Sequence, residues 1–312
     1  MTSSISSNPT IKRLENERYA LFQQIRQYQM LFLGCIGGGA FLIYIYQQGG
    51  LSSYPFWVVI FLGGIAIAGV IFCIYNWIMM TQTFIRKIKK QAIKTVFQIE
   101  ELDWSYEPKN YLEQPYFENS RLFSSKPTNY SGNHLVLGSF DSIPFGMSIL
   151  DCSRGGGKSQ EQIFKGLFIQ LNAPNQLKGT TVILPDIAQR ILGKSFGKKL
   201  QNMNSHRKMK MVYFEEEENF EKKFVVYSSE EASARKILSK EMIQKLLEFN
   251  QLYPGKFRVS IQPNAINIAI SNMKIFKLSA GQSLTDNNNW KSTRIDLKRL
   301  KEILQFFANS FS

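Results

Sequence analysis

The segment closest to a known phosphate-binding motif is the run Arg154-Gly155-Gly156-Gly157-Lys158-Ser159. In a P-loop, GxxxxGK[ST], glycine amides wrap a phosphate and the lysine reaches it. The first glycine of that pattern would fall at Cys152, so the motif is incomplete. A strand-like run precedes it, and Thr181–Asp186 (TVILPD) resembles an apolar strand ending in a metal-binding Asp. We interpret the run as a glycine-rich hairpin loop between two strands and keep nucleotide binding as the alternative.

Other titratable residues do not form a catalytic pattern. His134 falls in an expected strand and His206 in a basic loop, and the sequence contains no HExxH or GxSxG motif. Glu215–Glu218 with Glu221 could collect divalent cations, but such a cluster is more typical of a solvated acidic turn. We therefore expect no catalytic residues, no bound metal and no cofactor.

The three cysteines lack the CxxC spacing of zinc sites and redox motifs. Cys35 and Cys73 lie in an apolar stretch and Cys152 in an expected strand, so we expect buried, reduced thiols. Basic residues also cluster at Gly193-Lys194, Lys198-Lys199 and Arg207–Lys210. This stretch fits a solvated helix and loop, or alternatively a surface for lipid head groups or an acidic partner. No basic stripe interleaved with aromatic residues is present, so we do not expect nucleic-acid binding.

These side chains must be positioned by a chain with an unusual charge distribution. From Gln27 to Ile85 the sequence contains no Asp, Glu, Lys or Arg. Met30–Tyr46 and Phe56–Met80 are each within the range needed to cross a bilayer, about 17–25 residues. The connection between them, QQGGLSSYP, is rich in turn residues. We predict a two-helix transmembrane hairpin over residues 30–80, preceded by a helix from Pro9 that lies on the membrane or continues into the first span.

The orientation of the hairpin follows from its basic flanks. The loop between the spans has no Lys or Arg, whereas both outer flanks are basic, so both termini are expected in the cytoplasm. Residues 1–100 hold +6 of the formal net charge of +14. The predicted location is the bacterial inner membrane, and basic side chains near anionic lipid contribute about 1 kcal/mol each. The downstream membrane-flanking residues are Arg86, Lys87, Lys89, Lys90 and Lys94.

Small residues in the spans predict close helix contact. Gly34 and Gly38 have GxxxG spacing, and Gly63 and Gly64 lie in the second span. Such residues let helix backbones approach in lipid. We favour packing within the hairpin, and homo-oligomerisation is the alternative. Because neither span contains an ionisable group of the kind that marks ion pathways, a channel is not expected.

The rest of the chain is predicted to be an α+β domain. Residues 81–129 form a basic helix and an irregular connector, and 130–312 a cytoplasmic domain with a mixed or antiparallel sheet, after an N-terminal segment of residues 1–29. Predicted helices cover Ile187–Leu200, Ser228–Leu238, Lys240–Leu252 and Ile295–Phe307. Predicted strands cover His134–Phe140, Ile143–Cys152, Ile163–Leu171, Thr180–Leu184, Met211–Phe214, Phe224–Tyr227, Phe257–Ile261 and Ala265–Ile270.

Three blocks of this domain resemble an uncharacterised bacterial family, catalogued as domain of unknown function 3137. They are IFKGLFIQLNAPNQLKGTTVILPD, FEKKFVVYSSEEASARKILSKEMIQKLLEF and KFRVSIQPNAINIAI, and the SYEP of Ser105–Pro108 also fits. The resemblance covers most of residues 10–270 and is weakest over Phe276–Ser292. It implies two membrane spans before the domain and membrane-associated assembly, but it supplies no catalytic residue.

Three functions agree with these features. The first is a non-catalytic scaffold anchored in the membrane, whose domain binds a protein partner or the lipid surface. The second is a nucleotide-binding enzyme or sensor that uses the Arg154–Ser159 loop. The third is an effector whose glycine-rich spans assemble and perturb the membrane when the domain binds a ligand.

Overall fold

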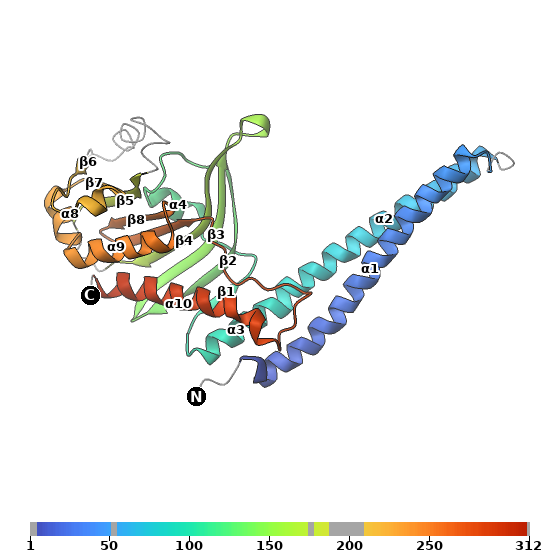
Figure 1. Ribbon diagram of the computed structural model, residues 1–312, viewed down its shortest axis with the longest axis horizontal. Helices are drawn as coiled ribbons and strands as arrows, with labels where there is room; N and C mark the ends of the chain where they lie inside the picture. Colours follow the sequence, from blue (N-terminus) through green and yellow to red (C-terminus); the bar gives the residue numbers. More distant parts are fainter. Residues whose placement is uncertain (1–4, 51–54, 174–177, 187–208, 311–312) are drawn as a thin grey trace. The chain divides into compact units, whose positions relative to one another are not determined.

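The computed structural model describes residues 5–50, 55–173, 178–186 and 209–310. The chain divides into two compact units (Figure 1). Unit 1 comprises Met1–Glu100 and Leu278–Lys291, and unit 2 comprises Glu101–Lys277 and Ser292–Ser312. The predicted α+β class is confirmed, since long apolar helices precede an antiparallel sheet with helices. The predicted helix over Ile187–Leu200 lies outside the described residues.

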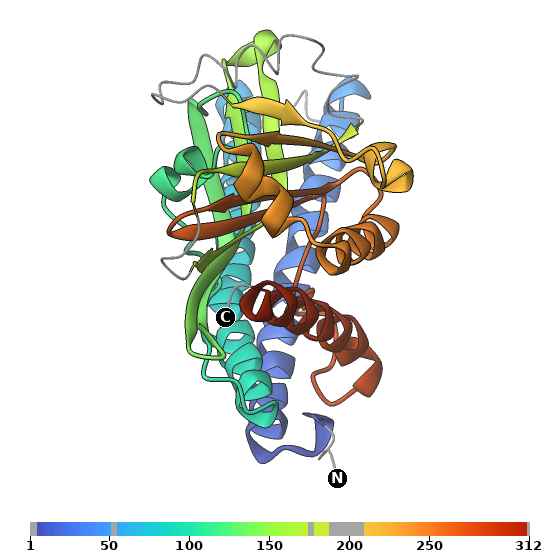
Figure 2. The ribbon, with the colours of Figure 1, turned by 90° about the vertical axis from the view of Figure 1, so that its left-hand side faces the viewer.

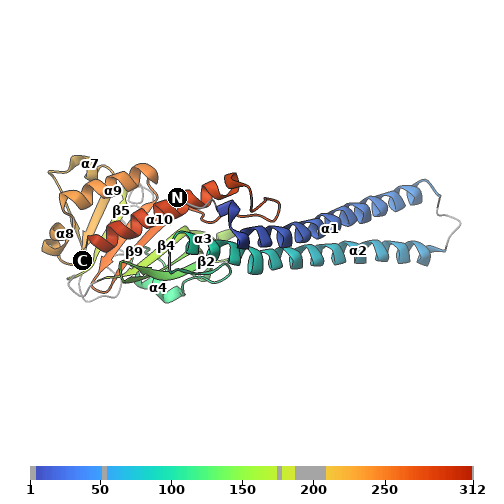
Figure 3. The same ribbon diagram turned by 90° about the horizontal axis from the view of Figure 1, so that it is seen from below.

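Unit 1 contains a long antiparallel helix pair (Figure 3). After a 3-10 turn, η1 (Ile5–Ser7), helix α1 spans Pro9–Gln47 without a break, so the N-terminal helix continues into the first apolar run. Its start is fixed by Asn8, whose Oδ1 accepts a 2.9 Å hydrogen bond from the Thr10 amide, and by Pro9 in the first turn. Helix α2 (Phe56–Thr83) returns beside it.

The buried face of α1 follows a heptad spacing. The first five buried positions are spaced by alternating steps of three and four residues, which keeps one face toward the partner helix. Four of the five residues are apolar, and the third is a buried arginine. These positions are Ile11, Leu14, Arg18, Leu21 and Ile25.

A π-helical turn, η2 (Phe84–Lys89), joins α2 to α3 (Lys90–Ile99). A π-turn inserts residues into an α-helix and rotates the side chains that follow. Phe84 and Ile88 in this turn and Ala92 after it are buried at steps of four residues. Among the described side chains of α2 only Cys73 is buried, so a continuous buried face begins at this turn.

Both long helices are long and apolar enough to cross a membrane. The most apolar 18-residue windows of these helices, within Pro9–Gln47 and Trp57–Ile99, are 0% and 6% buried. The core helix of a soluble protein would be mostly buried, so burial inside this chain does not account for their apolar surface.

Unit 2 is built on one nine-stranded sheet with strand order β1-β2-β3-β4-β9-β8-β5-β7-β6, and every neighbouring pair is antiparallel. The strands are β1 (Ser105–Glu107), β2 (Asn129–Phe140), β3 (Ile143–Arg154), β4 (Glu161–Asn172), β5 (Thr181–Pro185), β6 (Lys210–Val212), β7 (Phe224–Ser228), β8 (Phe257–Gln262) and β9 (Ala265–Ser271).

The two faces of the sheet are covered by different elements (Figure 2). One face packs against α9 (Lys240–Leu252), where the rings of Phe249 and Phe257 lie 5.1 Å apart, and α10 (Asn287–Asn309) packs beside α9. The opposite face packs against the connector with α4 (Gln114–Asn119), whose Phe117 contacts Phe168 of β4. Short helices α7 (Glu218–Glu221) and α8 (Glu231–Ile237) flank β7.

Most predicted strands and helices are present within one or two residues. The main differences are the following. Strand β2 begins at Asn129 rather than His134, and α10 begins at Asn287 rather than Ile295. The connector, predicted as irregular, contains β1 and α4. The helix predicted to begin at Ser228 begins at Glu231 with Glu230 as its N-cap, and the Ser228 Oγ accepts a 3.1 Å hydrogen bond from the Glu230 amide.

Candidate functional site

The glycine-rich run closes a β-hairpin. It joins β3 directly to β4, with Arg154 paired to Glu161 across the hairpin and only a 3-10 turn, η3 (Gly157–Ser159), between them. Gly155 has a φ of +81°, and its amide donates a 3.0 Å hydrogen bond to Thr128 Oγ1. A side chain at Gly155 would lie 2.8 Å from a backbone oxygen. Gly155 and Gly157, which has a φ of +58°, therefore have a conformational reason in the turn, whereas a P-loop leads from a strand into a helix.

The other candidate groups are also held by neighbouring residues. His134 lies in β2 with a φ of +61°. Its Nδ1 is 2.6 Å from the Tyr106 hydroxyl, and its ring stacks on the Tyr106 ring. Glu221 accepts a hydrogen bond from the Phe214 amide, and Glu218 pairs with Lys222. Across the described ranges no three His, Cys, Asp or Glu side chains could hold a metal ion together. His206 and the basic stretch from residue 193 to 208 lie outside those ranges.

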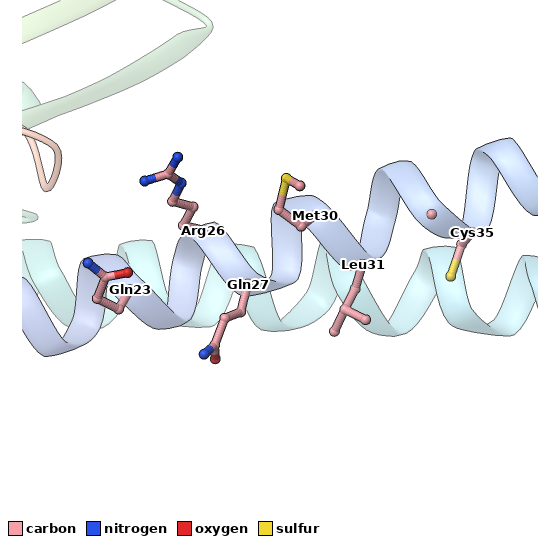
Figure 4. A pocket seen from close by; sticks show the side chains of 7 residues that line it. Gln23, Arg26, Gln27, Met30, Leu31 and Cys35 are labelled. Atoms are coloured by element: carbon pink, nitrogen blue, oxygen red, sulfur yellow. The ribbon is translucent and has the colours of Figure 1, made fainter.

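Unit 1 contains a groove on α1 where polar residues give way to apolar ones (Figure 4). Its volume is about 760 Å³. In Figure 4 the side chains of Gln27, Leu31 and Cys35 lie on one side of α1, and those of Arg26 and Met30 lie on the opposite side. The full lining, from the polar to the apolar end, is Gln23, Arg26, Gln27, Met30, Leu31, Gly34 and Cys35.

The glycines chosen from the sequence do not make the contact between α1 and α2. A Cβ atom built on any of them meets nothing within 4 Å; they are Gly34, Gly38, Gly63 and Gly64. The helices come close instead at Gly39 and Gly69. A Cβ atom built on Gly39 would lie 3.9 Å from the Ala66 Cβ, and one built on Gly69 would lie 2.9 Å from the Cys35 Sγ. The GxxxG spacing identified small residues but not the helix face on which they lie. Continuing the heptad steps of three and four residues from Ile25 would have indicated the face that contacts α2, which includes Cys35 and Gly39. Helix association through the outward-facing glycines stays a prediction.

The basic flank after α2 is divided between exposed and buried side chains. Arg86 and Lys87 are exposed, and the Lys87 ammonium lies 3.2 Å from Glu17. Lys90 and Lys94 are half-buried. Lys89 is buried, with only 8% of its surface exposed, and this burial lowers its pKa to about 8. The five residues therefore do not form one uniformly solvated basic patch.

A buried ion pair in unit 1 holds the segment Leu278–Lys291 against α1. Arg18 donates to Glu15 at 2.7 Å and to the carbonyl of Ala280 at 2.5 Å. Glu15 also accepts from the Leu284 amide at 2.7 Å and from the Ser283 hydroxyl at 2.9 Å. This is the segment in which the sequence pattern was weakest, and nothing in its composition pointed to Glu15.

The ion pair also changes the acidity of its carboxylate. Burial by itself acts to raise the pKa of Glu15, but the hydrogen bonds from Arg18, Leu284 and Ser283 outweigh it. The net pKa of Glu15 lies below its usual value. The charged form of Glu15 is therefore the one that fastens the segment.

The fold defines an α+β protein with two candidate membrane-spanning helices. The model of the family described as protein of unknown function (DUF3137) matches residues 162–308, which confirms the resemblance over that part of the chain. No curated protein matches this chain. The solved crystal structure of the mycobacterial trehalose monomycolate transport factor A, TtfA, shares 11% identity, with a TM-score of 0.33 over 66% of this chain and 97% of that chain. A likeness this distant supports no statement about function.

Proposed function

We propose that this chain is a non-catalytic binding protein anchored in the bacterial inner membrane, whose unit 2 binds a protein partner or the membrane surface. The observation that supports this most is the apolar exterior of the hairpin. Phe41, Trp57 and Ile67 are 61%, 68% and 64% exposed. Large exposed apolar surfaces mark contact with a membrane or a partner, and two helices of this length match a bilayer.

The boundary between apolar and charged residues supports an orientation with both termini in the cytoplasm. Arg26 on α1 and Arg86 after α2 are exposed and lie at the ends of the apolar stretches nearest the termini. The connection between α1 and α2 has no basic residue. In this arrangement the neck formed by the first turns of α1 with η2 and α3 stands on the cytoplasmic side.

The groove on α1 fits an anionic lipid in this arrangement. A guanidinium at its polar end pairs with a phosphate, while Met30, Leu31 and the open position at Gly34 offer an apolar path for an acyl chain. Native mass spectrometry in a phosphatidylglycerol and phosphatidylcholine mixture tests it. Arg26→Gln is expected to reduce retained phosphatidylglycerol, while the exposed Gln24→Ala retains it. Equal retention by both would contradict the lipid contact.

Membrane extraction tests the anchor itself. The wild-type chain is expected to stay in the membrane pellet after alkaline carbonate treatment. Replacing Ile67 and Ile71, which are 64% and 62% exposed on α2, by Lys should release it, since a charge at the centre of a span costs about 2.5–3.5 kcal/mol. Gln24→Lys, on the part of α1 that precedes the apolar run, is the matched control and should not release the protein. Release of the wild type would contradict integral insertion.

A second candidate function is an oligomerising, membrane-perturbing hairpin. It is favoured by one observation, that Gly34 and Gly38 lie on one helical face with open space around them. Overexpression would then arrest growth, and Leu at both positions would relieve the arrest, whereas Leu at Gly63 and Gly64 serves as the comparison. Unchanged arrest in the first variant would count against this function.

The nucleotide-binding alternative is tested with the same protein. Thermal unfolding with ATP or GTP and Mg²⁺ is expected to show no shift that depends on Lys158, because the loop closes a hairpin. A shift that Lys158→Ala abolishes would overturn the non-catalytic proposal.

A further inference from the structure

Arg258 places a positive charge in the middle of the sheet of unit 2. It lies on β8, where it pairs with Ala269 of β9, which in turn pairs with Phe168 of β4. Neighbouring residues of a strand point to opposite faces. Because Phe257 packs on α9, Arg258 points to the face covered by the connector. There its guanidinium carbon lies 5.0 Å from the centre of the Phe123 ring.

The guanidinium of Arg258 has no anionic partner among the described residues. Its Nε is enclosed and makes no hydrogen bond, and no ion pair joins it to an acid among the described residues. Residues 1–4, 51–54, 174–177, 187–208 and 311–312, which the structure does not describe, contain no Asp or Glu. Burial lowers the pKa of Arg258 to about 10, so the group is still charged at neutral pH. A buried charge without a counter-charge is costly.

Polar neighbours on this face make the position unlike an ordinary core. Ser260 and Gln262 follow Arg258 on the same face of β8, and the buried Asn267 of β9 pairs with Ser260. The Gln262 amide donates to the carbonyls of Asn119 and Ser120 in the connector and to Ser260 Oγ. These bonds fix the connector beside Arg258 while leaving the guanidinium itself unbonded.

We propose that Arg258 is the anchor of a binding site for a small ligand that carries an oxyanion, either a phosphate or a carboxylate group. A guanidinium presents its N–H donors in one plane, in a fork that matches two oxygens of such a group. The guanidinium carbon lies over the Phe123 ring. The Nη donors of Arg258 make no hydrogen bond to another described residue and are left for the ligand, and the bound anion supplies the missing counter-charge.

The site is independent of the membrane anchor and is tested on the full chain in a neutral detergent. Thermal unfolding is followed at pH 7 and constant ionic strength while chloride is exchanged for inorganic phosphate or for acetate. The unfolding temperature of the wild type is expected to rise saturably with at least one anion, and Arg258→Met is expected to lose that rise. The anion that acts distinguishes a phosphate ligand from a carboxylate ligand.

The variants also separate binding from a structural role. Without added anion, Arg258→Met should unfold no earlier than the wild type, because it removes an unpaired buried charge. Arg258→Lys keeps the charge but loses the fork, and should need a several-fold higher anion concentration. Arg235→Met is the matched control, since Arg235 also lies over a ring, Phe214 at 5.5 Å, but pairs with Glu231 at 2.8 Å. It should keep the full response. No rise in the wild type, or an equal rise in the Arg258→Met variant, would overturn the proposal.

Discussion

Replacing Lys89 by Met is expected to stabilise unit 1 at neutral pH. Lys89 lies in the π-helical turn and is buried, which lowers its pKa from 10.5 to about 8. One pKa unit corresponds to about 1.4 kcal/mol, so the shift corresponds to a cost of about 3 kcal/mol for the charged lysine. Methionine has a similar unbranched stem and no charge, and it should recover most of that cost.

The gain from Lys89→Met should depend on pH in a defined direction. Below about pH 8 the lysine is protonated in both the folded and unfolded states, and its full cost is present. Between about pH 8 and 10.5 the unfolded state binds more protons, so the free energy of unfolding of the wild type rises with pH. The difference between wild type and variant should therefore shrink over this window and vanish above it.

Chemical denaturation in a neutral detergent at pH 7, 8, 9 and 10 measures this difference. Lys87→Met is the matched control, because the Lys87 side chain is 70% exposed and its ion pair with Glu17 is an exposed one, worth about 0–1 kcal/mol. It should show a small effect without the pH-dependent convergence. If Lys89→Met destabilises the protein, or if its effect does not change with pH, the reasoning from burial of the ammonium is refuted.

Two further changes test unit 1. Glu15→Gln should lower the free energy of unfolding by about 3 kcal/mol, because it leaves the Arg18 charge buried without its carboxylate. Faster hydrogen exchange at the Leu284 amide would report the loosened segment, and unchanged exchange would contradict the role of the ion pair. Because the pKa of Glu15 is lowered on folding, this contribution is present above about pH 4.3 and is lost as pH falls through the folded pKa. Gly69→Leu should lower the unfolding temperature by overpacking against Cys35, a cost of about 1–3 kcal/mol, whereas Gly64→Leu meets open space and should not; equal effects would contradict the assigned helix contact.

The sheet of unit 2 was largely predictable because its strands carry strong local signals. Pro263 and Asn264 separate two β-rich runs and form the turn between β8 and β9. Residues 163–171 are held as a strand by β3 and β9, which flank them on both sides. That pairing is a tertiary effect which periodicity does not contain.

The parts that escaped prediction depend on contacts distant in sequence. The first turns of α10 are polar, and the signal that they are structured is Trp290, whose Nε1 donates to the Leu284 carbonyl at 2.7 Å. Glu15 and Arg18 are three residues apart on one helix, a spacing common in exposed ion pairs, and the contacts that distinguish them come from Ala280 and Leu284, far away in the sequence. The alternating strand pattern around Arg258 predicts the sheet face on which it lies. It does not predict that no acid of the described residues pairs with it.

Cysteine accessibility in intact cells tests most directly the central claim, that the hairpin crosses the membrane with both termini in the cytoplasm. Single cysteines are placed at Ser52 or Ser312 in a chain whose Cys35, Cys73 and Cys152 are replaced by Ala. A membrane-impermeant maleimide added outside is predicted to label Ser52→Cys at once and Ser312→Cys only after the cells are permeabilised. Labelling of Ser312→Cys in intact cells, or protection of Ser52→Cys, would contradict the account.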